Sequence, residues 1–133
     1  MGMIERDYIM RLIYEVIRTL LKLIFHIDIK KKNGYMFEEE QRSERCGELL
    51  KLIELGKLNE AENQLMDGLD IHDKRDLELA LYVYAALNEK DSDFLEAHDF
   101  SRKEILDGIR TVCRIYGYGS IAESLTDEID TEP

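Results

Sequence analysis

The sequence predicts an all-α protein, a bundle of about six helices with a long N-terminal helix. Apolar residues recur at intervals of three and four along most of the chain, and no stretch alternates apolar with polar residues as a strand does. Helix breakers are rare, with one proline and eight glycines in 133 residues. Since 44% of the residues are apolar, the chain can bury a core, which excludes the disordered and disulfide-scaffold classes. We expect residues 1–125 to form a single helical domain and residues 126–133 an acidic, flexible tail.

The first predicted helix runs from Met3 to about Ile27. Its charged side chains form one stripe at helical spacing, and apolar residues fill the rest of its circumference. The charges recur every three or four residues, which excludes a membrane-spanning segment. The apolar arc is wider than one globular neighbour covers, so we expect part of it to meet a second copy of the chain or a lipid surface. The residues assigned to self-association are Ile9, Ile13, Val16, Leu20 and Ile24.

A helical hairpin is predicted next. The second helix, from about Tyr35 to Leu55, begins polar and becomes apolar, and Gly56 ends it. A short third helix follows over Asn59–Gly68, with Asn59 as its expected N-cap. Two antiparallel helices joined at a glycine form a helical hairpin.

The segment from Lys74 to about Asn88 would be apolar on all sides of a helix, and among its central residues only Glu78 is charged. A helix of this kind must be surrounded by others. We therefore place it at the centre of the bundle, with its tyrosine hydroxyls reaching the rim or a polar partner. After it, Asp91 is expected to cap a short turn, and Ser101 to open the last helix through a capping box.

Charge is distributed unevenly along the chain. The net charge of −11 excludes general affinity for the phosphate backbone of nucleic acids. Residues 1–34 hold seven basic and four acidic groups, for +3, whereas residues 35–133 hold eleven and twenty-five, for −14. A basic first helix could therefore dock on the acidic body of its own chain, on that of a second copy, or on an anionic membrane.

No motif for catalysis or cofactor binding is found in the sequence. Cys46 and Cys113 lie within apolar helical patterns and are expected to be reduced core residues. His72–Asp73 and His98–Asp99 each place an imidazole beside a carboxylate, but such pairs at helix boundaries are more often caps than metal ligands. We predict no catalytic residue, no cofactor and no metal site.

The segment Gly56–Glu62, followed by Leu65 and Leu69, resembles the hairpin turn of a tetratricopeptide repeat, with its Gly-x-aromatic-x-Glu-Ala pattern. The similarity extends over 42–75 and departs from that family at Leu49, where a small residue is usual. No second copy follows at a fixed offset, so one repeat-like hairpin within a bundle is expected rather than a repeat array. The resemblance implies an inner face that is either a groove for a partner's helix or peptide, or ordinary core. This face consists of Ser43, Cys46, Leu50 and Ile53.

Two further stretches carry a second resemblance. Ile4–Arg11 and Phe100–Glu104, together with the layout of the chain, are similar to a family of small uncharacterised proteins from low-GC Gram-positive bacteria. The resemblance supports a helical fold. It implies no activity and no catalytic residue.

We expect a non-enzymatic protein-interaction or scaffold protein that forms a homodimer and binds an unidentified protein or peptide. The absence of a secretory signal pattern predicts the cytoplasm. Two alternatives stay open: a peripheral membrane-surface regulator that uses the basic first helix, and an enzyme with an unrecognised site.

Overall fold

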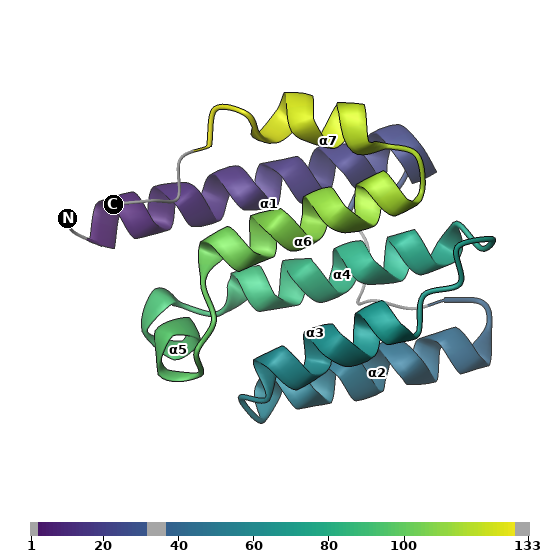
Figure 1. Cartoon of the computed structure of the whole chain (residues 1–133), viewed down its shortest axis with the longest axis horizontal. Coiled ribbons are helices and arrows are strands. Elements are labelled where there is room, and N and C mark those ends of the chain that lie inside the picture. Colours follow the sequence, from purple (N-terminus) through teal and green to yellow (C-terminus); the bar gives the residue numbers. More distant parts are fainter. Residues whose placement is uncertain (1–2, 32–36, 130–133) are drawn as a thin grey trace.

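The computed structural model describes residues 3–31 and 37–129, which form seven helices and no strand (Figure 1). The all-α prediction is confirmed. The helices are α1 (Met3–Phe25), α2 (Glu40–Glu54), α3 (Leu58–Asp67), α4 (Arg75–Glu89), α5 (Ser92–Ala97), α6 (Arg102–Ile115) and α7 (Gly119–Thr126). None of the described helices, the 23-residue α1 included, has both the length and the hydropathy that a membrane-spanning segment needs.

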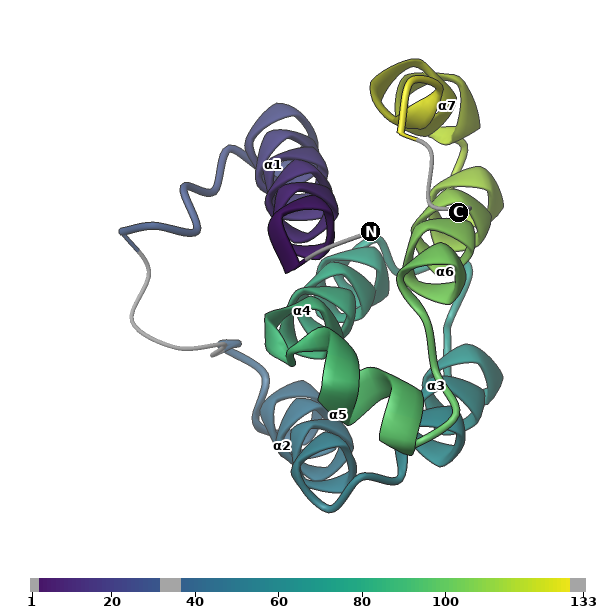
Figure 2. The ribbon, with the colours of Figure 1, turned by 90° about the vertical axis from the view of Figure 1, so that its left-hand side faces the viewer.

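Helix α4 is the centre of the bundle. Every residue from Asp76 to Asn88 is buried, because α1, α2 and α6 all pack against this helix. Figure 2 shows α4 between α1 and α7 on one side and the hairpin of α2 and α3 on the other. The predicted central helix and the predicted polar partners of its tyrosines are confirmed, since the Tyr82 hydroxyl donates to Glu78 and the Tyr84 hydroxyl to Glu62.

The apolar arc of α1 is covered by the chain's own helices. Ile13 and Leu20 are fully buried, Val16 and Ile24 nearly so, and Ile9 is half-buried against the core. The fold therefore leaves four of these five residues no free surface for self-association, whereas the assignment of Ile9 stays a prediction. The physical reason is that α4, α6 and α7 all contact α1, so its wide apolar arc meets three neighbours instead of one.

Arg102 and Asn88 join three helices. The Arg102 guanidinium donates to the backbone carbonyls of Asn88 at 2.8 Å and Lys90 at 2.7 Å, and the Asn88 amide donates to the Met10 carbonyl at 2.9 Å. Burial lowers the pKa of Arg102, and the negative charge of Asp91 partly offsets this effect. The Phe100–Glu104 stretch thus holds α6 to the end of α4.

Two helix starts differ from the sequence prediction. Helix α2 begins at Glu40 rather than near Tyr35, which lies outside the described residues. Before the helix, the backbone of Phe37 is bonded to the Ser43 hydroxyl, which accepts from the Phe37 amide and donates to the Phe37 carbonyl. Asn59 does not cap α3, whose N-cap is Lys57. The predicted caps Asp91 and Ser101 are confirmed, because their side chains accept from the amides of residues 94 and 104.

The C-terminal segment is more ordered than predicted as far as it is described. The expected domain boundary at residue 125 falls inside α7, whose last residue Thr126 is buried. The Arg110 guanidinium donates to the Thr126 hydroxyl at 2.9 Å and to its carbonyl at 3.2 Å. Residues 130–133 of the predicted tail lie outside the described part of the chain.

Two glycines should respond in opposite ways to alanine. A Cβ on Gly108 would overlap the Tyr84 phenol, whereas a Cβ on the exposed Gly47 would meet nothing within 4 Å. We expect Gly108→Ala to lower the free energy of unfolding by about 1–3 kcal/mol through overpacking. Gly47→Ala should raise it by up to about 1 kcal/mol, because alanine favours the helix interior. Urea denaturation followed by circular dichroism measures both, and equal effects would contradict the packing.

Candidate functional site

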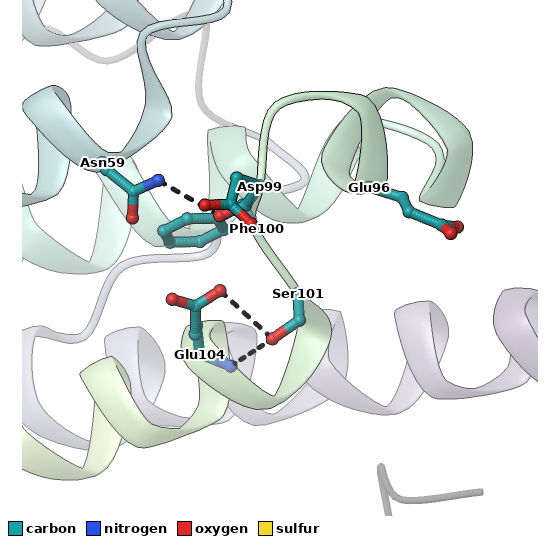
Figure 3. Close-up of a pocket in the computed structure, with 6 residues that line it drawn as sticks. All are labelled: Asn59, Glu96, Asp99, Phe100, Ser101 and Glu104. Atoms are coloured by element: carbon teal, nitrogen blue, oxygen red, sulfur yellow. Dashed lines mark hydrogen bonds between the residues drawn. The ribbon is translucent and has the colours of Figure 1, made fainter.

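An acidic hollow opens at the surface between the start of α3, the segment after α5 and the start of α6. Its volume is about 340 Å³. Three of its six lining residues are carboxylates, and Phe100 is the buried member of the set (Figure 3). The lining is Asn59, Glu96, Asp99, Phe100, Ser101 and Glu104. An open depression with this lining favours cationic groups over anions or apolar ligands.

The wall of the hollow is held by local hydrogen bonds. Asp99 adopts a left-handed backbone conformation with φ of 59°, which aspartate tolerates better than most residues. The Asn59 amide donates to the Asp99 carbonyl at 3.1 Å, so α3 fixes the segment after α5. Ser101 accepts from the Glu104 amide at 3.1 Å and donates to its carboxylate at 3.2 Å, whereas Glu96 points away from the other five residues (Figure 3).

Glu62 is a half-buried acid on α3, close to this hollow. Burial raises the pKa of its carboxyl group; the hydrogen bond from Tyr84, at 2.7 Å, lowers it, and the negative charges of Glu104 and Asp107 raise it further. The pKa of Tyr84 is in turn raised by burial and by the Glu62 charge. Glu62, Asp99 and Glu104 have no ion-pair partner within the described ranges. We call these three residues the acidic face.

The outer face of α1 has the opposite character. We define it by four exposed residues on the solvent side of the helix, which are Tyr8, Arg11, Lys22 and Leu23. Tyr8 is 55% and Leu23 58% exposed, values that are high for large apolar side chains. Arg18 is paired with Glu15 at 3.1 Å, but Arg11 and Lys22 have no ion pair among the residues that the structure describes. This face combines unpaired cations with exposed apolar surface.

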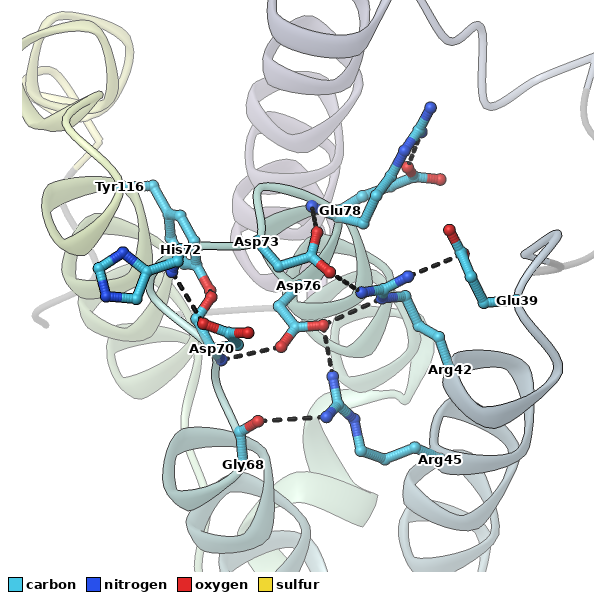
Figure 4. Close-up of polar contacts among 11 residues, drawn as sticks. Glu39, Arg42, Arg45, Gly68, Asp70, His72, Asp73, Asp76, Glu78 and Tyr116 are labelled. Atoms are coloured by element: carbon cyan, nitrogen blue, oxygen red, sulfur yellow. Dashed lines mark hydrogen bonds and ion pairs between the residues drawn. The ribbon is translucent and has the colours of Figure 1, made fainter.

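A polar cluster ties the α2–α3 hairpin to the start of α4 (Figure 4). At its centre the Asp76 carboxylate, 1% exposed, accepts from Arg42 at 3.0 Å, from Arg45 at 2.5 Å and from the Asp70 amide at 2.8 Å. Arg42 also pairs with Asp73. Burial alone would lower the pKa of Arg42, but its bond to Asp76 and the charge of Asp73 raise it overall.

The second buried acid of α4 is satisfied in the same way. Glu78, also 1% exposed, accepts from Arg75 at 2.5 Å and from the Tyr82 hydroxyl at 2.6 Å. Nearby, the hydroxyl of Tyr116, the C-cap of α6, donates to the Asp70 carbonyl at 2.7 Å. Burial, and then the negative charges of the neighbouring aspartates, raise the pKa of Tyr116 to about 12. Both buried carboxylates therefore have hydrogen-bond donors. We call Arg42, Arg45 and Asp76 the clamp, because their bonds hold the hairpin to the start of α4.

No group of three or more His, Cys, Asp or Glu side chains within 3–31 and 37–129 is arranged to hold a metal ion. Cys113 is buried, and this burial raises the pKa of its thiol to about 12, which leaves it protonated and unreactive at neutral pH. Cys46 is buried as well, and both cysteines are free thiols.

The four residues predicted on the inner face of the hairpin do not form a groove. Cys46 and Ile53 are fully buried in the core, and Leu50 is half-buried against it. Ser43 is engaged with the Phe37 backbone. Helix α4 packs against α2. Of the two interpretations of these residues, a groove for a partner or ordinary core, the structure favours ordinary core.

The clamp was not found by sequence reasoning. Arg42 and Arg45 stood in a polar stretch, and their partner Asp76 lies more than thirty residues away. One signal was available, because a charged residue in an otherwise apolar helix must have a buried partner. Glu78 carried that signal, but the sequence could not name its partner.

A model of a family of unknown function, DUF6483, matches residues 3–117. The chain belongs to this family. The match extends from α1 through the end of α6 and stops before α7, so it includes the clamp, the acidic face and the outer face of α1. No curated protein and no solved structure shows significant similarity to the chain.

Replacing Glu62 with glutamine should stabilise the protein in a pH-dependent way. The folded pKa of Glu62 lies above its ordinary value of 4.5, so ionisation costs stability as the pH rises from about 4.5 through the folded pKa. Glu62→Gln removes this cost and keeps an acceptor for Tyr84. We expect the melting temperature to rise by about 2–4 °C at pH 7 and to match the wild type near pH 4. The control Glu60→Gln, at an exposed position on the same helix, should leave the melting temperature unchanged at both pH values.

Breaking the clamp should be costly. Asp76→Asn removes the charge that two arginines share, and we expect a loss of about 3–5 kcal/mol in the free energy of unfolding, as for other buried ion pairs. Asp107→Asn is the matched control, because Asp107 is half-exposed and pairs only with Lys103 and Arg110 of its own helix. It should cost less than about 1 kcal/mol. Equal losses in urea denaturation would contradict the clamp.

Proposed function

We propose that the protein is a non-enzymatic protein-binding domain, and that the outer face of α1 is its contact surface for an acidic partner. The observation that carries this proposal is the pairing of exposed Tyr8 and Leu23 with unpaired Arg11 and Lys22 on one helix face. Large apolar side chains drive association when they are covered, and the cations favour a partner of opposite charge.

The surface suits recognition better than catalysis. Arg11 and Lys22 lie about 16 Å apart along the helix axis, at 1.5 Å per residue, a spacing that fits an extended contact with another protein. The two exposed apolar residues lie near opposite ends of α1, Tyr8 in its second turn and Leu23 in its last. An acidic partner would thus be held at several points along one helix.

The hairpin of α2 and α3 is consistent with a tetratricopeptide-like origin for this region. Its turn is made at Gly56, with φ of 81°, a left-handed conformation that favours glycine. A Cβ there would overlap the His98 ring. In this proposal the hairpin supports the core through the clamp, and the partner binds elsewhere.

Two wider expectations belong to the same proposal. The free, buried thiols of Cys46 and Cys113 support a reducing compartment such as the cytoplasm. The Ile4–Arg11 and Phe100–Glu104 stretches support an origin of the family in low-GC Gram-positive bacteria.

The test is crosslinking in the cells that make the protein, followed by purification and quantitative mass spectrometry. The double variant Arg11→Gln, Lys22→Gln should lose its specific partners by about tenfold, which corresponds to about 1.4 kcal/mol of binding energy. The control variant Lys51→Gln, Lys57→Gln removes two exposed cations outside α1 and should retain them. Equal partner recovery by both variants would contradict the proposal.

A further inference from the structure

We infer that the partner of the outer face of α1 is a second copy of this chain, which docks its acidic face against α1 in a head-to-tail arrangement. The inference rests on the proposed function and names the partner. It follows from two complementary surfaces that one copy carries and cannot bring together within itself.

The acidic side of the contact is the three-residue face at the hollow. Glu104 and Asp99 line the depression, and Glu62 stands nearby on α3. Glu62 and Glu104 repel each other, since the negative charge of Glu104 raises the pKa of Glu62. Cations placed among them would relieve this repulsion.

The basic side is supplied by α1 and the turn after it. Arg11 and Lys22 are exposed and without an ion pair in the described part of the chain, and Lys30 and Lys31, also exposed, follow the helix. Tyr8 and Leu23 add apolar surface at the two ends of the stripe. In the proposed contact, cations of this series meet the acidic face of the neighbouring copy, whose three carboxylates have no ion pair within 3–31 and 37–129.

The two surfaces lie on different sides of the molecule. Figure 2 shows α1 at the upper left, and α3 and α6 at the right. Helix α1 contacts α6 through its buried side, so its outer face is directed away from the acidic face. A pair of copies joined in this way leaves one basic and one acidic surface free, and further copies can add to it.

Charge also sets the conditions for this contact. The net charge of −11 makes copies repel one another at long range, whereas the complementary surfaces attract when they are close. Because the attraction is electrostatic and exposed, it should weaken in about 1 M salt, where the screening length falls to about 3 Å. Association should therefore be strongest near physiological salt and high protein concentration.

Two variants with one neutralised surface each test the arrangement. The basic-side variant is Arg11→Gln, Lys22→Gln. The acidic-side variant is Asp99→Asn, Glu104→Gln, in which asparagine suits the left-handed conformation at position 99 and glutamine can still act in the capping box. Neutral replacements are used so that the altered surfaces do not attract each other. Melting temperatures close to that of the wild type show that both variants are folded.

Sedimentation velocity and light scattering give the readout. The wild type should grow beyond twice 15.6 kDa as its concentration rises, and each variant alone should stay at one copy. An equimolar mixture of the variants should stop at two copies, because only one intact pair of surfaces is left. Loss of the wild-type assemblies in about 1 M salt is also expected.

Four outcomes would overturn the inference: a wild type that stays monomeric, a wild type that stops at a symmetric dimer, variants that associate alone, or a mixture that does not pair. Wild-type binding to phosphatidylserine vesicles without self-association would also overturn it, in favour of a lipid partner. The proposed function is tested separately. If the wild type is monomeric but the variant Arg11→Gln, Lys22→Gln loses other protein partners, the contact surface on α1 stands and only the identity of its partner changes.

Discussion

The burial of α4 along its whole length is the constraint on which the rest of the structure depends. A helix apolar on every side is stable only when other helices remove all of its surface from water, and α1, α2 and α6 do so here. The constraint extends to its two acids. Asp76 and Glu78 are buried with the helix, and a buried carboxylate must be paired. The arginines of α2 and Arg75 meet that requirement.

This arrangement decides what is left for the surface. The apolar arc of α1 is buried in the core, so the solvent side of this helix exposes its cations and two large apolar residues, Tyr8 and Leu23. The acids of α3 and α6 gather at the far side of the molecule, where Glu62 is held by the Tyr84 hydroxyl below it. The fold thus places the exposed cations Arg11 and Lys22 and the acidic face on different sides of the molecule, which is the basis of both the proposed contact and the head-to-tail inference.

Much of the fold could be predicted because its signals are local. The apolar run around residue 80 predicted the central helix, and the side chains of Asp91 and Ser101 predicted two caps that the structure confirms. The errors arose where distant segments meet. Asn59 has the chemistry of a cap, but its amide reaches Asp99 instead. The flexible tail was predicted to begin at residue 126, but Thr126 is the last residue of α7, which packs against α1 and α6.

The sequence by itself determined the helices, their order, the central position of α4 and the separation of charge along the chain, since each of these depends on neighbouring residues and on helical periodicity. Only the tertiary structure decided which apolar faces are covered. Ile13 and Leu20 look the same in sequence whether a second chain or the other helices of the bundle cover them. The clamp of Arg42, Arg45 and Asp76 likewise joins residues that periodicity does not relate, because ion pairs between helices are set by how the helices pack.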